Sequence, residues 1–454
     1  MSAALWDSAS LREATGGAVP EGVAVTGVSI DSRGTGAGDL FIALRDARDG
    51  HDFVPDALAR GAACAMVDRE IPGAGPLLRV GDTLAGLTAL GAAGRARSPA
   101  RFVAVTGSVG KTSTKEMLAA GLSACGAVHA AAASYNNHWG VPLTLARMPA
   151  GTAFAVIEIG MNNPGEIAPL TRLARPHVAM VTNVGAAHIG HLGSLEAIAR
   201  EKGSIALGLE PGGVAVLPAE DAMLPVLREA VGAGHRVMTF GAGGEVEALE
   251  VRADAEGSDV VAAIGGQRVA FRLGASGAHL VRNAIGALAA VRALGCDAAA
   301  LAPRLGDYRV MQGRGALERI ATADGGTATL LDESFNGQPP SVRAALAVLR
   351  LVPARRRIAV LGQMGELGDY SVAEHAALAP HVQEAADAVL LCGRDMPHLA
   401  AALPPGLVLA VTETSAELAP LVAAALRDGD AVLVKGSKAT LMGKVLTAIR
   451  GNAR

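Results

Sequence analysis

Aromatic side chains are scarce in this sequence: they account for 3% of its 454 residues, although 50% of the residues are hydrophobic. Aliphatic side chains must therefore fill most of the interior, which is typical of layered α/β folds. Cysteine is scarce as well. The four cysteines, Cys64, Cys125, Cys296 and Cys392, lie far apart in the sequence and form no CxxC pair. This spacing argues against a zinc site or a disulfide framework and indicates free thiols in a reducing compartment.

The sequence also lacks a strong net charge and a long apolar run. Its net charge is -3 and its basic residues are scattered, so we expect no nucleic-acid partner. It contains no uninterrupted apolar stretch of about 18 residues and no basic start followed by an apolar run at residues 1–7, so we expect neither a membrane span nor a signal peptide. These absences predict a cytoplasmic protein.

The length predicts about three domains at roughly 150 residues each, and the sequence pattern divides the chain accordingly. Residues 1–97 are expected to form a small α/β module, and Ser98-Pro99 marks a linker. Residues 98–312 show strand–loop–helix repeats, which predict a parallel sheet covered by helices. The predicted strands of these two parts are 23–30, 39–44, 62–67, 102–106, 153–159, 178–183 and 214–217, with a meander at 246–273; the predicted helices are 54–61, 112–123, 194–208 and 279–294.

Residues 313–454 begin a second strand–helix series, typical of a Rossmann-like domain. Its predicted strands are 327–332, 357–361, 388–392, 407–411 and 431–434. The predicted fold class is thus α/β with three domains: a small N-terminal module, a central parallel-sheet ATPase domain with a phosphate-binding loop, and a C-terminal Rossmann-like domain.

The clearest motif lies where the apolar strand 102–106 runs into a glycine-rich turn and then into a helix. Backbone amides of such a turn can close around phosphate oxygens, and the helix dipole favours the negative charge. Lys111 is expected to hold the β- and γ-phosphates of ATP, and the Thr112 hydroxyl to bind Mg²⁺. The predicted phosphate loop comprises Thr106, Gly107, Ser108, Val109, Gly110, Lys111, Thr112 and Ser113. Val105 stands where the full Walker motif has its first glycine, and the loop alone leaves kinases, GTPases, transporter ATPases and ligases open.

Acidic and histidine side chains follow the next predicted strands. Glu158 ends the strand 153–159, and His188 follows the strand 178–183, so both are predicted at the carboxyl edge of the same sheet as metal ligands. His191 has a weaker claim. Lys202, on the predicted helix 194–208, would on its own be an ordinary solvated lysine.

Several segments resemble the Mur ligase family in their order and spacing. They include TGSVGKTSTKEM (106–117), NNHWGVPLTL (136–145), EIGMNNPGEI (158–167) and NVGAAH (183–188). In residues 31–53, DSR, GDLFIAL and DGHDF are similar to the uridine-nucleotide-binding module of one branch of that family. The resemblance covers nearly the whole chain. It implies an ATP- and Mg²⁺-dependent ligase, acting as a monomer, that adds D-alanyl-D-alanine to UDP-N-acetylmuramoyl-tripeptide through an acyl phosphate in peptidoglycan synthesis.

The resemblance also implies roles for individual residues. It assigns Lys111, Glu158, His188 and Lys202 to catalysis, with Lys202 as a carbamate that helps to bind a second Mg²⁺. It assigns His279, Asn283, Arg314, Asp332 and Asn336 to the nucleotide, and Ser32, Arg33, Asn136, Asn137, Lys435 and Ser437 to the substrates. For Asn136 and Asn137 a turn-stabilising role is an almost equal alternative. Ala47 and Gln363 depart from residues that are common in this branch, which bears on substrate details rather than on the reaction.

Three alternatives stay open at this point. Another Mur ligase, chiefly the one that adds the third peptide residue, is the nearest, although the DNPR motif of the diaminopimelate-adding enzymes is absent. A folylpolyglutamate-type ligase would share the central fold but not the N-terminal module. A nucleotide-binding regulatory protein without activity is disfavoured by the intact Lys111, Thr112, Glu158 and Lys202. Diaminopimelate and lysine both remain possible as the third residue of the peptide substrate.

Overall fold

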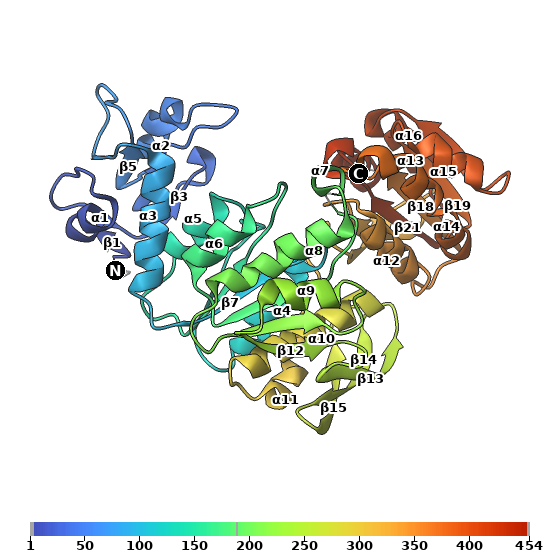
Figure 1. Cartoon of the computed structure of the whole chain (residues 1–454). Helices are drawn as coiled ribbons and strands as arrows, with labels where there is room; N and C mark the ends of the chain where they lie inside the picture. Colours follow the sequence, from blue (N-terminus) through green and yellow to red (C-terminus); the bar gives the residue numbers. More distant parts are fainter. Residues whose placement is uncertain (1–3, 188, 452–454) are drawn as a thin grey trace.

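Three sheets, each covered by helices, build the chain in the computed structural model, which describes residues 4–187 and 189–451. Within these ranges a four-stranded, a nine-stranded and a six-stranded sheet follow one another along the chain, together with a small two-stranded ribbon. Figure 1 shows the corresponding N-terminal, central and C-terminal domains, with the central domain between the other two. The predicted three-domain α/β fold is confirmed.

The N-terminal domain is built on a parallel sheet in the order β3-β4-β5-β6. Its elements are β1 (Trp6–Asp7), α1 (Ser8–Thr15), β2 (Ala24–Val25), β3 (Gly27–Ser29), β4 (Asp39–Ile42), α2 (Val54–Ala59), β5 (Cys64–Val67), β6 (Leu77–Arg79) and α3 (Thr83–Ala96). The strand predicted at 23–30 is divided: β2 pairs with β1, whereas β3 joins the main sheet.

The central domain has the sheet order β15-β14-β13-β12-β11-β10-β7-β9-β8. Its elements are β7 (Arg101–Thr106), α4 (Lys111–Leu122), β8 (Val128–Ala130), α5 (Gly140–Ala146), β9 (Phe154–Glu158), α6 (Ile167–Ala174), β10 (Val178–Val181), α7 (Ile189–Leu192), α8 (Leu195–Gly203), β11 (Val214–Pro218), α9 (Leu224–Val231), β12 (Arg236–Phe240), β13 (Val246–Ala253), β14 (Ser258–Ile264), β15 (Gln267–Leu273), α10 (Ala278–Ala293) and α11 (Ala298–Leu301). Strands β8 to β12 pair in parallel with their neighbours, and β13 to β15 form the predicted antiparallel meander.

Two central elements are shorter than predicted. The strand expected at 178–183 ends at Val181, and the helix expected at 194–208 ends at Gly203 and continues as a 3-10 turn over residues 204–208. Strand β10 stops because Thr182 and Asn183 turn toward the loop after β7, where they make hydrogen bonds.

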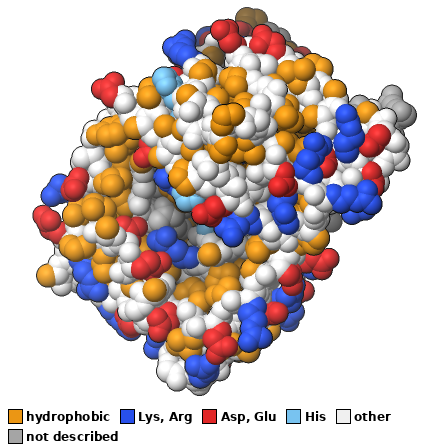
Figure 2. Space-filling model, turned by 90° about the vertical axis from the view of Figure 1, so that its right-hand side faces the viewer, with side chains coloured by type: hydrophobic (Ala, Val, Ile, Leu, Met, Phe, Trp, Pro, Cys, Tyr) orange, Lys and Arg blue, Asp and Glu red, His pale blue; other side chains and the backbone are white. Residues whose placement is uncertain are grey.

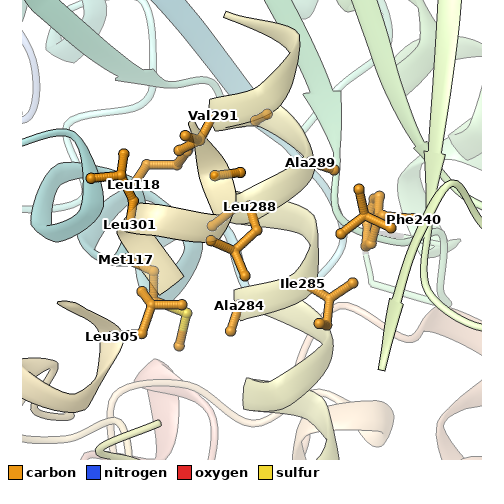
Figure 3. Close-up of a cluster of buried hydrophobic side chains, with 14 of the residues drawn as sticks. Met117, Leu118, Phe240, Ala284, Ile285, Leu288, Ala289, Val291, Leu301 and Leu305 are labelled. Carbon is orange, nitrogen blue, oxygen red and sulfur yellow. The ribbon is translucent and has the colours of Figure 1, made fainter. Parts of the chain in front are cut away.

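Helix α10 forms the centre of the central core. Figure 3 shows Ala284, Ile285 and Leu288 of this helix between Met117 and Leu118 of α4 on one side and Phe240 of β12 on the other. Because α10 contacts the core on most of its surface, it is apolar around most of its circumference. The first turns of α4 and α10 are thereby held next to each other.

The C-terminal domain has the sheet order β16-β17-β21-β18-β19-β20, in which only β16 runs antiparallel to its described neighbour. Its elements are β16 (Ala316–Ala321), β17 (Thr327–Glu333), α12 (Pro339–Leu349), β18 (Arg356–Gly362), α13 (Ser371–Ala376), α14 (Ala379–Ala385), β19 (Ala388–Cys392), α15 (Met396–Ala402), β20 (Val408–Thr412), α16 (Ser415–Ala425), β21 (Asp430–Lys435) and α17 (Gly443–Gly451). All five strands predicted for this domain are confirmed to within one residue at each end, and β16 was missed.

The described cysteines are free thiols, as predicted. Burial raises the pKa of Cys64 to about 12 and that of Cys392 to about 11. Cys125 and Cys296, which are distant in the sequence, lie side by side, and burial together with the neighbouring Cys125 thiol raises the pKa of Cys296. Within the described ranges, no helix is both long and apolar enough to cross a bilayer.

Helix α3 fixes the N-terminal domain on the central domain and was not predicted. Its sequence, TLAGLTALGAAGRA, has glycines instead of a stripe of large apolar residues, so its periodicity is weak. The glycines allow the backbone of α5 to approach: a Cβ atom at Gly94 would lie 2.3 Å from the carbonyl oxygen of Leu145. A second contact comes from Trp6, whose indole Nε1 donates to the Ala146 carbonyl oxygen at 2.9 Å.

We predict that Gly94→Ala destabilises the protein by about 1–3 kcal/mol, because a backbone atom cannot move away as a flexible side chain would. Urea denaturation measures the free energy of unfolding. Gly121→Ala in α4 is the matched control: a Cβ atom there has nothing within 4 Å, so alanine should stabilise by about 0.5–1 kcal/mol. Equal stability of Gly94→Ala and the unchanged protein would contradict the proposed close contact.

Candidate functional site

The loop between β7 and α4 requires glycine at two positions. At Gly110 the backbone has φ 83°, a left-handed conformation, and a Cβ atom would lie 2.6 Å from Asn283 Oδ1. At Gly107 a Cβ atom would lie 1.8 Å from Thr182 Oγ1. The loop therefore approaches α10 and the end of β10 more closely than any side chain would permit.

Residues after β10 hold this loop in place through hydrogen bonds. Asn183 Oδ1 accepts from the Val109 amide at 3.1 Å, while Thr182 Oγ1 and Asn183 Nδ2 donate to the Val109 carbonyl oxygen at 2.6 and 3.0 Å. Ser108 Oγ donates to the Gly185 carbonyl oxygen at 3.0 Å. These hydrogen bonds satisfy polar groups of the loop on the side that faces the residues after β10. The shape of the loop is therefore set before a ligand binds.

Lys111 begins α4 and folds back over the loop, where its Nζ donates to the Gly107 carbonyl oxygen at 2.7 Å. Burial lowers the pKa of Lys111, and the nearby Glu158 carboxylate opposes this shift. A lysine in this position can reach phosphate oxygens held by the loop.

The hydroxyl of Thr112 and the carboxylate of Glu158 meet at the carboxyl ends of β7 and β9. Thr112 Oγ1 donates to Glu158 Oε2 at 2.9 Å, and Asn136 Nδ2 donates to Glu158 Oε1 at 2.7 Å. Glu158 is 1% exposed. A hydroxyl and a carboxylate next to a phosphate-binding loop are the hard oxygen donors that Mg²⁺ prefers, so these residues fit that ion. Among the described residues no group of three or more His, Cys, Asp or Glu side chains forms a metal cluster.

A cavity of about 500 Å³ lies over this loop, between the central and C-terminal domains. Figure 2 shows a face of the molecule that is hollowed near its centre and has charged side chains of both signs. The cavity is lined by the following predicted residues: Ser108, Val109, Gly110, Lys111, Thr112, Ser113, Asn136, Asn137, Glu158, His279, Asn283, Arg314, Asn336 and Lys435. The structure therefore joins the loop, the first turn of α10 and parts of the C-terminal domain in one site.

Arg314 connects the two domains across this cavity. It lies on the segment before β16, its Nη2 donates to Ser134 Oγ of the central domain at 2.8 Å, and its guanidinium stacks 3.8 Å over the ring of Phe335. Burial lowers the pKa of Arg314, and Glu158 and Glu333 oppose this shift. A planar cation fixed from both sides is suited to binding phosphate oxygens.

On the C-terminal wall, Lys435 is almost fully buried at the end of β21. Its Nζ donates to Glu333 Oε2 and to the Asn336 carbonyl oxygen, both at 3.0 Å. The lysine is therefore oriented by the same short segment that carries Asn336 and Phe335 into the cavity.

Two predicted C-terminal residues do not line the cavity. The side chain of Asp332 leaves β17 on the face opposite to Glu333, where it accepts from Arg450 at 3.0 Å and from Ser334 Oγ at 2.7 Å. Ser437 is buried, and its amide donates to the Gln363 carbonyl oxygen at 3.0 Å. Both residues support the loops that reach the site.

Other predicted residues lie outside the cavity or have a different local role. Ser32 and Arg33 lie on a 3-10 turn of the N-terminal domain, and Arg33 pairs with Asp31 at 2.7 Å. Asn137 lines the cavity, but its Oδ1 accepts from the Gly140 amide at 2.9 Å, so it also stabilises the turn that leads into α5. Thr106 is the last residue of β7 and Gly107 the first residue of the loop, and neither lines the cavity.

Lys202 is on α8 and is 1% exposed, which contradicts the reading as a solvated lysine. Burial, followed by the nearby Lys111, lowers the pKa of Lys202 well below its usual value. The predicted ligand His188 lies outside the described residues. His191 is exposed on α7, with its Nδ1 3.5 Å from Asn163 Oδ1.

The cavity wall also contains residues that the sequence did not predict, among them Ser134, Arg282, Glu333, Phe335 and Gln338. Glu333 could have been found, because it directly follows the predicted strand 327–332 and strand ends converge at ligand sites. Ser134 and Gln338 lie in irregular segments whose sequence has no hydrophobic periodicity. Only the tertiary structure brings them to the site.

A phosphate-binding loop at the carboxyl edge of a parallel sheet, with a carboxylate beside it and a second domain closing the cavity, defines a P-loop nucleotide-dependent enzyme. Comparison with known proteins narrows this class. Residues 24–76 match the Mur ligase family catalytic domain, residues 105–291 the Mur ligase middle domain and residues 317–438 the Mur ligase glutamate ligase domain.

Relatives and solved structures agree with these matches. A UDP-N-acetylmuramoyl-tripeptide–D-alanyl-D-alanine ligase of Synechocystis is 35% identical, over 94% of this chain and 93% of its own. The crystal structure of MurF from Acinetobacter baumannii is 31% identical, covers 98% of this chain and 99% of its own, and has a TM-score of 0.86. The crystal structure of MurF ligase from Thermotoga maritima in complex with ADP is 25% identical, covers 94% of this chain and 98% of its own, and has a TM-score of 0.79. This chain belongs to the Mur ligase family.

We predict that Arg314→Lys weakens the binding of a non-hydrolysable ATP analogue about tenfold, or about 1.4 kcal/mol, since lysine loses the stacking on Phe335 and the directed hydrogen bond to Ser134. Isothermal titration calorimetry gives the affinity. Arg319→Lys serves as the control, because Arg319 is exposed on β16. Among the described residues, its side chain makes a hydrogen bond only to Thr327. An unchanged affinity in Arg314→Lys would show that this arginine does not contact the nucleotide.

Proposed function

We propose that this chain is the ATP-dependent ligase that joins D-alanyl-D-alanine to UDP-N-acetylmuramoyl-tripeptide and so produces the UDP-linked pentapeptide, ADP and phosphate for peptidoglycan synthesis. The observation that carries the proposal is the single cavity in which Lys111, Thr112 and Glu158 face Asn336 and Lys435 of another domain. Relatives that align with this chain over 93% and 95% of their own length bear the name of that activity.

The proposed reaction has two steps. The terminal carboxylate of the tripeptide attacks the γ-phosphorus of ATP, the bond to the β-phosphate oxygen breaks, and ADP leaves an acyl phosphate behind. The amine of D-alanyl-D-alanine then attacks the acyl carbon, and the carbon–oxygen bond to phosphate breaks. The attacking nitrogen loses a proton, and the new peptide bond remains.

The main physical obstacle is charge repulsion between the carboxylate and the triphosphate. Two unit charges about 4 Å apart repel each other by about 4 kcal/mol at an effective dielectric constant near 20, and a triphosphate carries several. Lys111 and Arg314, which both line the cavity, provide positive charge where the carboxylate and the γ-phosphate must meet. The loop amides add further donors.

Mg²⁺ would be held by the Thr112 hydroxyl and the Glu158 carboxylate, and it would supply charge neutralisation on the phosphate oxygens. Asn136 orients Glu158 through its hydrogen bond of 2.7 Å. His188 and a modified Lys202 are proposed as ligands of a second ion.

Each domain has a proposed task. Residues 1–97 bind the UDP-sugar, with Ser32 and Arg33 among the contacts. Residues 98–312 bind ATP, with His279 and Asn283 near the adenine. Residues 313–454 close over the nucleotide and bind the incoming dipeptide, with Lys435 facing it and Asp332 and Ser437 supporting the loops; closure would exclude water from the acyl phosphate. Because UDP-sugars and ATP are cytoplasmic compounds, we place the reaction in the cytoplasm, with the chain acting as a monomer.

Addition of the third peptide residue is the alternative reaction. The absent DNPR motif and the names of the relatives favour the dipeptide-adding reaction.

The direct test is ATP consumption by the purified protein. We expect phosphate release that requires both UDP-N-acetylmuramoyl-tripeptide and D-alanyl-D-alanine, with the pentapeptide found by mass spectrometry. Lys111→Ala should abolish phosphate release and leave binding of the UDP-sugar unchanged, because that substrate contacts the N-terminal domain. Phosphate release without the peptide substrates would indicate a simple ATPase, and ligation of a free third amino acid to the dipeptide precursor would favour the alternative.

The buried position of Lys202 supports a carbamate. The lowered pKa favours loss of one proton from the ammonium, and the neutral amine can then attack CO₂: a nitrogen–carbon bond forms, one carbon–oxygen π bond breaks, and a second proton passes to solvent, so that the cation has become a carbamate anion. Such an anion beside Lys111 would be favourable, whereas an ammonium there is not.

We therefore predict that Lys202→Ala lowers kcat by at least about a hundredfold and that short carboxylic acids restore part of it, because they return the missing anion. With ¹³C-labelled bicarbonate, the unchanged protein should give a carbamate signal in NMR that Lys202→Ala lacks. Activity of Lys202→Ala equal to that of the unchanged protein would rule out the proposed role.

A further inference from the structure

A second lysine of α4, Lys115, is fully buried although none of the proposed steps uses it. Its Nζ donates to the carbonyl oxygen of Ala131 and lies 3.5 Å from that of Ala133, and it is 2.9 Å from Glu116 Oε1. Removing an ammonium group from water costs several kcal/mol unless its donors are satisfied. Here the compensation comes from the backbone of one short segment and from the Glu116 carboxylate.

That segment, residues 131–137, follows β8 and has no regular secondary structure. It carries three side chains that line the cavity, Ser134, Asn136 and Asn137. Ser134 Oγ lies 3.2 Å from Thr112 Oγ1 and accepts from Arg314 Nη2 at 2.8 Å, and Asn136 Nδ2 donates to Glu158 Oε1 at 2.7 Å. An irregular segment thus connects the hydroxyl, the carboxylate and the arginine to which we assign ATP and Mg²⁺.

Few other hydrogen bonds between described residues connect this segment to α4. Its own backbone contacts are local or point to β9 and α5, such as the Gly160 amide that donates to the Asn136 carbonyl oxygen at 2.7 Å. Lys115 and Thr112 lie three residues apart and therefore on the same face of α4, so both reach the segment. The lysine bonds to its backbone at residue 131, and Thr112 contacts Ser134 three residues later.

We propose that Lys115 is a positioning residue of the ligase reaction: it ties residues 131–134 to the helix of the phosphate loop and thereby holds Ser134 and Asn136 against Thr112, Arg314 and Glu158. The inference rests on the proposed function and adds a residue that acts through others. The ammonium matters because its three donors can serve the carbonyl oxygens of Ala131 and Ala133 and the Glu116 carboxylate at once, whereas methionine, of similar length, has no donor.

The first test compares Lys115→Met with Leu118→Ala. Methionine keeps the length of the side chain and removes its donors, whereas Leu118→Ala removes a buried core side chain of the same helix and leaves the segment untouched. We expect Lys115→Met to lower kcat at least about tenfold and to weaken binding of a non-hydrolysable ATP analogue about fivefold, with KM for the UDP-sugar unchanged. Leu118→Ala should lower Tm and keep kcat. If both variants lower Tm and neither lowers kcat, Lys115 is only structural and the inference is wrong.

The second test is a double-mutant cycle with Ser134→Ala. If Lys115 acts through Ser134, the loss of kcat in the double variant should equal that of the more damaging single variant, within about twofold. Multiplication of the two losses would show independent action and overturn the inference. Lys115→Gln replaces Lys115→Met in the cycle if the latter does not fold; its amide can reach one carbonyl oxygen, so an intermediate kcat is expected.

Failure of the proposed function is visible separately. If the unchanged protein does not ligate the two substrates, that function is wrong, whatever the variants do. Lys115 is then judged by nucleotide affinity alone, since Thr112 and Arg314 contact Ser134 regardless of the substrate. Equal affinities of the unchanged protein and Lys115→Met would in that case refute the positioning role.

Discussion

The buried carboxylate of Glu158 is the constraint on which the site depends. A negative charge at 1% exposure at the end of a sheet strand needs donors, and it has two, Thr112 Oγ1 and Asn136 Nδ2. Each donor comes from a different segment, one from the phosphate-loop helix and one from the loop after β8. Satisfying this one group therefore aligns both segments with β9, and it creates the position that a divalent cation with its nucleotide can occupy.

The parallel sheet makes this convergence possible. Strands β8, β7, β9 and β10 run in the same direction, so the segments that follow them begin at one edge. The loop after β10 supports the phosphate loop, and that after β8 contacts Thr112 and Glu158. The two lysines of α4 contact different segments. Lys111 donates to the phosphate loop, and Lys115 donates to the segment after β8.

The second domain completes the site from across the cavity. Arg314 reaches Ser134, and the Gly190 amide lies 3.4 Å from the Glu366 carbonyl oxygen. Because the cavity lies between the two domains, a relative motion of the domains would change access to it. Glu366, with φ 61°, adopts a left-handed conformation at this contact, which is uncommon for a residue with a side chain.

The sequence by itself determined the strand order along the chain, the phosphate loop and the acidic strand end. These features are local: apolar runs of strand length, glycines between a strand and a helix, and Glu158 at the end of β9. Only the tertiary structure decided the rest. It buried Lys202 and Lys115, turned Asp332 away from the cavity while Glu333 faces it, and brought Ser134 and Phe335 together around Arg314. The reason is physical: the face on which a side chain leaves its strand, and whether a charge is buried, depend on contacts with residues far away in the sequence.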